Sequence, residues 1–256
     1  MRALLPAAIL AALGAADPAA AQALTIGEND IVSLSGAPEV VSAAARVDAA
    51  GRPALDLTMR FPNECYADIG AKVFAMRAGD GPPHAVVTQR VTDTACIEIF
   101  QPVERGVTIL LPSVMAADEI RLIARSSAGP VQTLQTTIAG APGENAIAEA
   151  ETLAGFAPAA TDITVAAPES GPGYTVHATL TLDPGCAPDG LSARLFEVPD
   201  AEGQPSLDVL FVSAPAGCGG SGTAEIGINV ETPQAPAGRS LYVANEAEPL
   251  PRPLAP

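Results

Sequence analysis

The chain has 256 residues, few aromatic side chains, and a formal net charge of −16 from 29 Asp and Glu against 13 Lys and Arg. So acidic a chain is repelled by nucleic acid and by anionic lipid surfaces, and we expect neither as a partner. Its 23 Gly and 25 Pro disfavour long helices. The charge is enough to keep an exported protein in solution, and attraction of cations or of a basic protein is the alternative.

The first residues have the pattern of a secretory signal peptide. Arg2 gives a positive start, an apolar run covers residues 3–16, and small-residue cleavage sites lie before Gln22 and before Leu24. We prefer the second site, because Leu24 begins a strand-like segment, and so predict removal of residues 1–23. The apolar run is shorter than the ~20 residues that span a bilayer. We therefore expect a periplasmic or secreted chain with no membrane span after processing.

The rest of the chain contains one pattern twice. Matching segments, first copy and then second, are Gly27–Ile31 with Gly143–Ile147, Leu34–Pro38 with Leu153–Pro158, and Ala71–Phe74 with Ala193–Phe196. Such a repeat predicts two copies of one domain. We place them at residues 24–140 and 141–246. A Pro-rich tail, 247–256, follows the second copy, and its composition favours a frayed, polyproline II conformation.

Four cysteines, an even number in an exported chain, predict two disulfides. Three connectivities are possible, and the repeat selects one of them because a cysteine pair falls in each copy. The predicted bonds are Cys65–Cys96 and Cys186–Cys218. A metal or redox site is disfavoured, since no two cysteines form a CxxC motif.

Short strands of alternating polarity recur in each copy. Residues 55–61 alternate apolar and polar side chains, which is the period of a half-buried strand, and residues 174–182 do the same. The other matching strand-like segments are 72–76 with 194–198, 86–91 with 209–213, 107–111 with 226–230, and 120–125 with 240–245. Residues 131–138 add a strand in the first copy alone.

The fold class follows from these strands and the Gly- and Pro-rich turns between them. We predict an all-β protein of two tandem homologous β-sandwich domains, immunoglobulin-like in architecture, with one disulfide each. The chain has no Trp, so the buried Trp of immunoglobulin variable domains is missing. The joining stretch 145–153 is compatible with a helix, whereas its counterpart 29–34 favours a strand.

Candidate catalytic residues are scarce. His84 is predicted to lie in a loop after two prolines, and His177 on the polar face of its strand, where it aligns with Asp56. Neither histidine has a nucleophile motif nearby, and no GxSxG occurs. The glycine-rich segment 217–222 precedes a strand, whereas a phosphate-binding loop precedes a helix, so we interpret it as a turn. We predict no catalytic residue.

The acidic residues form no recognisable metal site. The EF-hand pattern is absent, and the pairs Glu28 with Asp30 and Asp183 with Asp189 supply fewer oxygens than calcium requires. We predict no metal and no cofactor.

The scarcity of chemistry and the duplication together favour an exported, non-enzymatic binding or structural module of the bacterial cell envelope. Faces, edge strands and the groove between copies offer surfaces for an envelope protein or a glycan. The alternative is an exported enzyme or enzyme inhibitor with its site in the loops 78–85 and 199–206. An enzyme would place His84 or His177 in a pocket within hydrogen-bond reach of a carboxylate and a hydroxyl.

Overall fold

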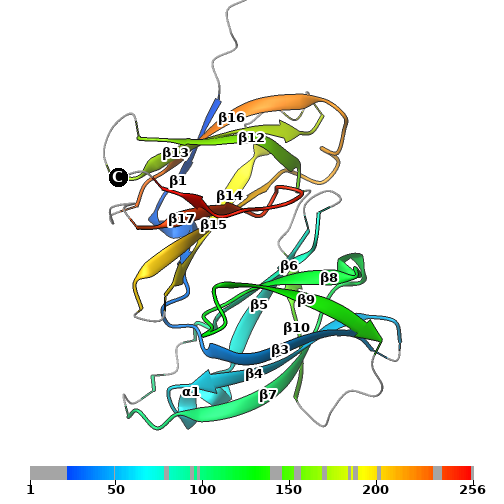
Figure 1. Cartoon of the computed structure of the whole chain (residues 1–256), viewed down its shortest axis with the longest axis vertical. Coiled ribbons are helices and arrows are strands. Elements are labelled where there is room, and N and C mark those ends of the chain that lie inside the picture. Colours follow the sequence, from blue (N-terminus) through cyan, green and yellow to red (C-terminus); the bar gives the residue numbers. More distant parts are fainter. Residues whose placement is uncertain are drawn as a thin grey trace, which may run out of the picture.

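The computed structural model describes residues 22–48, 50–77, 81–92, 95–96, 99–138, 146–152, 157–168, 172–183, 186, 190–200, 203–232 and 238–254. Over these residues the protein is all-β, with one α-helix, α1 (Glu64–Ile69), and the 3₁₀ turns η1 (Glu28–Asp30) and η2 (Ser113–Met115). The strands form two lobes, with the first lobe below the second in Figure 1. The predicted signal peptide up to residue 21 and the segment 143–145 lie outside the described residues.

The first lobe is a single nine-stranded sheet. Its strands are β3 (Glu39–Val47), β4 (Pro53–Phe61), β5 (Ala71–Met76), β6 (His84–Gln89), β7 (Val103–Leu110), β8 (Glu119–Ile123), β9 (Val131–Ile138), β10 (Ala146–Glu149) and β11 (Glu151–Thr152). The order across the sheet is β10-β7-β4-β3-β9-β8-β6-β5-β11. β9 pairs with β8 along one part and with β3 along the other. The two outermost strands, β10 and β11, follow each other directly in the chain, so the two edges of the sheet lie close together. The sheet therefore comes close to a closed barrel around its core.

The second lobe has two separate sheets around its core. Its strands are β1 (Gln22–Ile26), β2 (Ile31–Ser33), β12 (Ala159–Ala166), β13 (Tyr174–Thr181), β14 (Ser192–Pro199), β15 (Pro205–Ser213), β16 (Thr223–Val230), β17 (Ser240–Val243) and β18 (Arg252–Pro253). The four-stranded sheet has the order β1-β16-β13-β12, and the five-stranded sheet has the order β18-β17-β15-β14-β2. Both sheets contribute buried aliphatic side chains to one cluster, including Leu180, Ile228, Leu195 and Leu210.

The strand orders of the two lobes correspond position by position. The set β10-β7-β4-β3 matches β1-β16-β13-β12, and β11-β5-β6-β8-β9 matches β2-β14-β15-β17-β18. Each matching pair of neighbours also has the same parallel or antiparallel sense. The pairing differs at one point: β9 bridges its two half-sheets, whereas among the described strands the two-residue β18 pairs with β17 alone.

The first strands of the two repeats are exchanged between the lobes. β1 and β2 open the first repeat but pair with β16 and β14, so the blue β1 lies in the upper lobe of Figure 1. β10 and β11 open the described part of the second repeat but pair with β7 and β5 of the first lobe. Ile26 of β1 is buried in the core of the second lobe. The strand pairing therefore does not follow the sequence boundary at residue 140.

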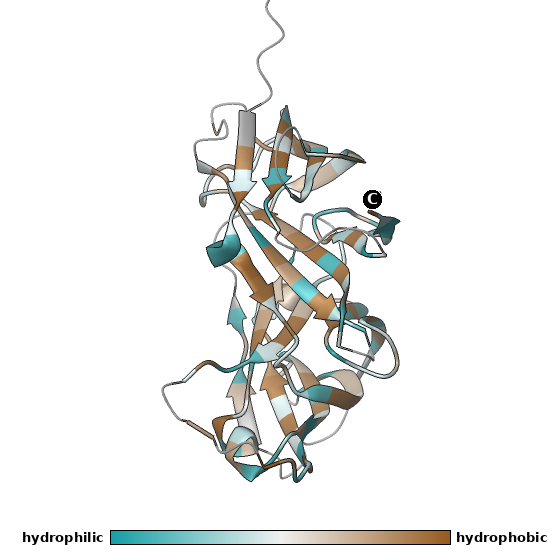
Figure 2. Cartoon of the chain, turned by 90° about the vertical axis from the view of Figure 1, so that its left-hand side faces the viewer, coloured by the Kyte–Doolittle hydropathy of each residue, from teal (hydrophilic) through white to brown (hydrophobic). Residues whose placement is uncertain are grey.

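A third hydrophobic cluster joins the lobes. Phe74 of β5 and Phe196 of β14 hold matching positions in the two repeats, and their ring centroids lie 5.9 Å apart. Their neighbours Val73 and Leu195 point into the lobe cores, because successive side chains of a strand alternate between faces. The hydrophobic segments of the strands are brown in Figure 2. The other buried members of the junction cluster are Leu34, Ala37, Met76, Val86, Ile123, Ala157, Val198, Leu207, Val209, Phe211, Tyr242 and Ala244.

Both disulfides are present with the predicted pairing. Cys65–Cys96 and Cys186–Cys218 have Cα–Cα distances of 5.8 and 5.6 Å. Cys65 lies on α1, a helix that the sequence pattern did not predict. The helix begins at Asn63, whose side chain caps it by accepting a hydrogen bond from the Tyr66 N–H. A helix of six residues is too short to produce a helical hydrophobic period.

A buried polar network distinguishes the second lobe. The Tyr174 hydroxyl donates to Asp208 Oδ2 at 2.6 Å, and Arg239 Nη2 donates to Asp208 Oδ1 and to Glu197 Oε1. Burial raises the pKa of the Asp208 carboxyl and of the Tyr174 hydroxyl. The strand registers place Ala85 of the first lobe at the position of Asp208. The two repeats therefore share a fold but not this network.

Two expectations for the ends of the second repeat are settled by strand pairing. The prediction of a frayed tail is wrong up to residue 254, because β18 pairs with β17 and Leu254 is buried in the second core. The Leu254 N–H also donates to the Arg239 carbonyl. The joining stretch forms β10 and β11 in its described part, as the strand interpretation requires.

Candidate functional site

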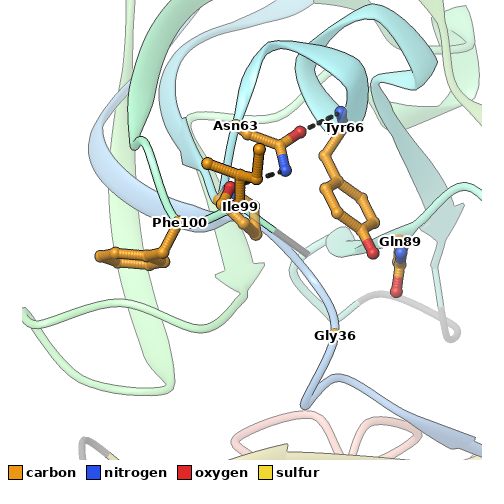
Figure 3. A pocket seen from close by; sticks show the side chains of 7 residues that line it. Gly36, Asn63, Tyr66, Gln89, Ile99 and Phe100 are labelled. Carbon is orange, nitrogen blue, oxygen red and sulfur yellow. Dashed lines mark hydrogen bonds between the residues drawn. The ribbon is translucent and has the colours of Figure 1, made fainter. Parts of the chain in front are cut away.

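A pocket of about 290 Å³ opens beside α1 in the first lobe (Figure 3). We call it the α1 pocket. It is lined by Gly36, Pro62, Asn63, Tyr66, Gln89, Ile99 and Phe100. These residues come from four places: the β2–β3 connection, the start of α1, the end of β6, and the segment after Cys96.

Asn63 holds two walls of the pocket together. Its Oδ1 accepts from the Tyr66 N–H at 3.2 Å, and its Nδ2 donates to the Ile99 carbonyl at 3.0 Å, as the dashed lines in Figure 3 show. The disulfide Cys65–Cys96 joins the same two segments covalently. Asn63 is 7% exposed, so its hydrogen bonds are shielded from water. The pocket is thus a preformed feature of the first lobe.

The outer wall exposes large apolar side chains. Ile99 is 58% exposed and Phe100 is 81% exposed. On the inner wall the Tyr66 hydroxyl points toward the side-chain amide of Gln89 (Figure 3). That amide lies against Gly36, where a Cβ would collide with its oxygen. The α1 pocket therefore combines an apolar wall with one hydroxyl and one amide.

The chemistry of this lining suits binding. None of its seven residues is a carboxylate, a histidine, a lysine or an arginine, so the lining provides no charged acid or base for proton transfer. Ligand pockets typically have this composition, with apolar walls and a few polar groups that set orientation.

The second repeat has a glycine turn where the first has Ile99 and Phe100. Cys218 is buried, and its carbonyl accepts from the Asp183 N–H at 2.9 Å. A Cβ on Gly220 would lie 2.9 Å from that same nitrogen, so the turn packs directly on Asp183. Residues 217–222 form neither a helix nor a strand, as expected for a turn between strands. The apolar wall is thus specific to the first lobe.

The two histidines lie apart from the α1 pocket. His84 was expected in a loop, but it begins β6 and is 1% exposed. Its Nε2 lies 2.9 Å from the Tyr242 hydroxyl of the second lobe, because the strand carries it into the junction between the lobes. Burial, and next the charge of Arg121, lower the pKa of His84 to about 3. His177 is exposed on β13, as the alternation of that strand predicts.

A second pocket lies between the lobes. This junction pocket has a volume of about 310 Å³ and includes Pro199, Asp200 and Ser206 from the loop singled out as a candidate enzymatic site. The first lobe contributes Glu39, Arg125, Ser126, Ser127, Gly129 and Pro130. Neither histidine lines it.

No group of three or more metal-ligating side chains occurs within the described residues. Glu28 and Asp30 lie exposed on η1, and Asp189 is outside the described residues. No described helix is long and apolar enough to cross a bilayer.

The α1 pocket was not predicted from the sequence. One signal was present: the apolar residues after Cys96 replace the glycines that follow Cys218. No sequence pattern indicated that Asn63 and Gln89 line the same pocket, because only the fold brings them next to Ile99 and Phe100. Searches of protein-family models, curated proteins and solved structures found no match to this chain.

Proposed function

We propose that this chain is an exported, non-enzymatic binding module of the bacterial cell envelope, which holds an apolar side chain of a partner protein in the α1 pocket. The observation that carries the proposal is the exposure of Ile99 and Phe100 beside a preformed apolar pocket. A Phe side chain left in water forgoes roughly 2 kcal/mol of burial free energy, which a partner recovers on contact. Exposed apolar groups gathered at a pocket mark interaction sites.

The partner segment is neutral or basic. The net charge of −16 disfavours an acidic partner. The Tyr66 hydroxyl and the Gln89 amide supply hydrogen bonds for a polar group next to the buried side chain. A peptide segment supplies both groups: an apolar side chain for the pocket, and a polar backbone for the hydrogen bonds.

We infer that the architecture is a tandem pair of homologous immunoglobulin-like sandwich domains with one disulfide each. The corresponding strand orders and matched disulfides support this view. The sequence repeats at 24–140 and 141–246 then record a duplication. Each repeat contributes its first strands to the sheets of the other lobe, so the two units are held together by strand pairing.

Export by a cleaved signal peptide is part of the proposal. β1 pairs with β16 from Gln22 onward, so cleavage before Gln22 preserves the whole strand, whereas cleavage before Leu24 removes two paired residues. We therefore expect a mature chain that begins at Gln22, which intact mass or amino-terminal sequencing of the exported protein will read. A mature chain that begins at Leu24 would contradict this expectation and restore the site preferred on sequence grounds.

The α1 pocket is tested by capture of the partner in the native envelope. A tagged, cross-linked chain should retain one stoichiometric protein, and Phe100→Ser should weaken its retention about 30-fold, the effect of losing a 2 kcal/mol hot spot. The matched control is Val114→Ser, which removes an exposed apolar side chain that does not line the pocket. Equal retention by both variants would refute the α1 pocket as the binding site.

The alternative function is an exported enzyme or enzyme inhibitor that acts through the junction pocket. The observation in its favour is the set of Glu39, Arg125 and Ser206 in one polar pocket. This function predicts no stoichiometric partner in the capture experiment. It also predicts an activity or inhibition that is lost in Arg125→Gln and unaffected in Phe100→Ser.

A further inference from the structure

The two lobes differ at one sheet edge. In the first lobe, residues 136–138 of β9 pair in parallel with residues 45–47 of β3. In the second lobe, β12 occupies the position of β3 and is the last strand of its sheet. Among the described residues, its outer side is paired only at Ala160, which bridges to Glu246. We call Thr161–Ala166 the open edge of β12.

The registers show which residues of the open edge correspond to the paired segment of β3. Ala45 lies opposite Leu55, and Val165 lies opposite Val176. Leu55 and Val176 are matching, fully buried residues of β4 and β13. Val165 therefore corresponds to Ala45, the residue on which β9 is seated.

The backbone groups of Ala45 point away from β4, toward the outer side of β3. The Ala45 carbonyl accepts a hydrogen bond from Thr137 Oγ1 at 3.3 Å, so it points toward β9 and away from β4. The Thr136 N–H, in contrast, donates to the Asp118 carbonyl on the far side of β9. Because N–H and C=O directions alternate along a strand, the Thr137 N–H faces β3. By correspondence, the N–H and C=O of Val165 point outward, away from β13.

We propose that the open edge of β12 binds an extended, neutral or basic peptide segment of a partner protein, which adds a parallel strand in the position that β9 occupies in the first lobe. The occupant follows from the internal precedent, since the chain already fills the equivalent edge with its own segment, residues 136–138. This addition of a strand to a sheet edge is a known mode of peptide recognition. The site is independent of the α1 pocket.

The side chains of the open edge fit this occupant. Thr161, Thr164 and Ala166 are exposed and small, so they leave room beside the strand for a second backbone. Asp162 is the one charged residue of β12 and lies at an irregularity with a positive φ of 52°. An acidic peptide would be repelled there, and the chain as a whole adds to that repulsion through its charge of −16.

The probe is a synthetic peptide with the sequence of residues 131–138, VQTLQTTI, added to the full mature chain. We expect saturable binding that perturbs backbone amide resonances of β12 but not those lining the α1 pocket. N-methylation of the peptide at the residue equivalent to Thr137 removes the inward N–H and should weaken binding about tenfold or more. N-methylation at the residue equivalent to Thr136 removes the outward N–H and should leave affinity within about twofold.

A protein variant gives a second, matched test. Val165→Pro removes an outward N–H without removing a hydrogen bond to β13, so it should abolish binding while the two disulfides and the fold are retained. If this variant unfolds, the comparison of the two methylated peptides still tests the proposal. Equal binding of both methylated peptides, or no binding of the unmodified peptide, would overturn the proposal. Sedimentation that shows a dimer lost in Val165→Pro would also overturn it, because a second copy would then be the occupant.

Discussion

A fragment of residues 34–152 will fold in an oxidising compartment, whereas a fragment of residues 24–140, of almost the same length, will not. The first fragment contains all nine strands of the first lobe and its disulfide. The second lacks β10 and β11 and instead carries the last three residues of β1 and all of β2, whose partners lie in the second lobe. The two missing strands make six paired positions, four in β10 and two in β11. At about 1 kcal/mol of net stability for one hydrogen bond at each of these positions, the loss is roughly 6 kcal/mol.

That loss is comparable with the whole stability of a small domain. The measurement is the dispersion of amide resonances together with thermal unfolding, with both fragments expressed in the periplasm. Each fragment exposes the same junction side chains, such as Phe74 and Val86, so any aggregation they cause affects both alike. Cooperative unfolding of the fragment 24–140 at the midpoint of the fragment 34–152 would show that the exchanged strands are dispensable. The boundary at residue 140 would then stand.

The sequence predicted the local elements that carry a strong period. Residues 131–138 were expected as a strand and form β9 with the same bounds. The disulfide pairing was equally predictable, because the repeat placed one pair in each copy. β3 and β12 were not predicted. Their apolar positions are filled largely by alanine, as in residues 43–45, and each strand contains a register shift that interrupts the alternation.

The strand exchange could not be predicted from local pattern. Alternation in a segment such as Leu24–Ile26 shows that one face is buried, but not which of two similar sheets buries it. The α1 pocket could not be predicted for the same reason, since Asn63 and Ile99 come into contact only in the folded chain. His84 was misplaced because two preceding prolines indicate a loop. A proline is tolerated at the start of a strand, so β6 can begin directly after Pro83.

The contact between His84 and Tyr242 makes the joined lobes sensitive to acid. The pKa of His84 is about 3 in the folded protein, mainly because burial disfavours its charged form, against an ordinary value of 6.5. Between these two pH values the unfolded chain binds a proton that the folded chain does not. Stability therefore falls as the pH drops below about 6.5, by about 1.4 kcal/mol per pH unit. By pH 3 the cumulative loss is roughly 4–5 kcal/mol.

The double variant His84→Leu with Tyr242→Phe should remove this slope. Leucine is the residue that the second repeat places at the matching position, Leu207, where it is buried in the junction cluster. Replacing both partners leaves neither the ring nitrogen nor the hydroxyl unpaired, so stability at pH 7 should change by less than about 1.5 kcal/mol. His177→Gln, which changes an exposed histidine, is the control and should retain the slope.

Urea unfolding at intervals from pH 7 to pH 4 measures the effect directly. Protonation linked to His84 should cost the wild-type chain roughly 3 kcal/mol of stability between pH 6.5 and pH 4, so the double variant should lose that much less than the wild type. The other titrating groups, carboxylates above all, are common to both chains and cancel in the difference. If the two chains show the same slope, His84 binds its proton in the folded chain as readily as in the unfolded chain. The lobes would then have to separate locally, or admit water, before the protein unfolds.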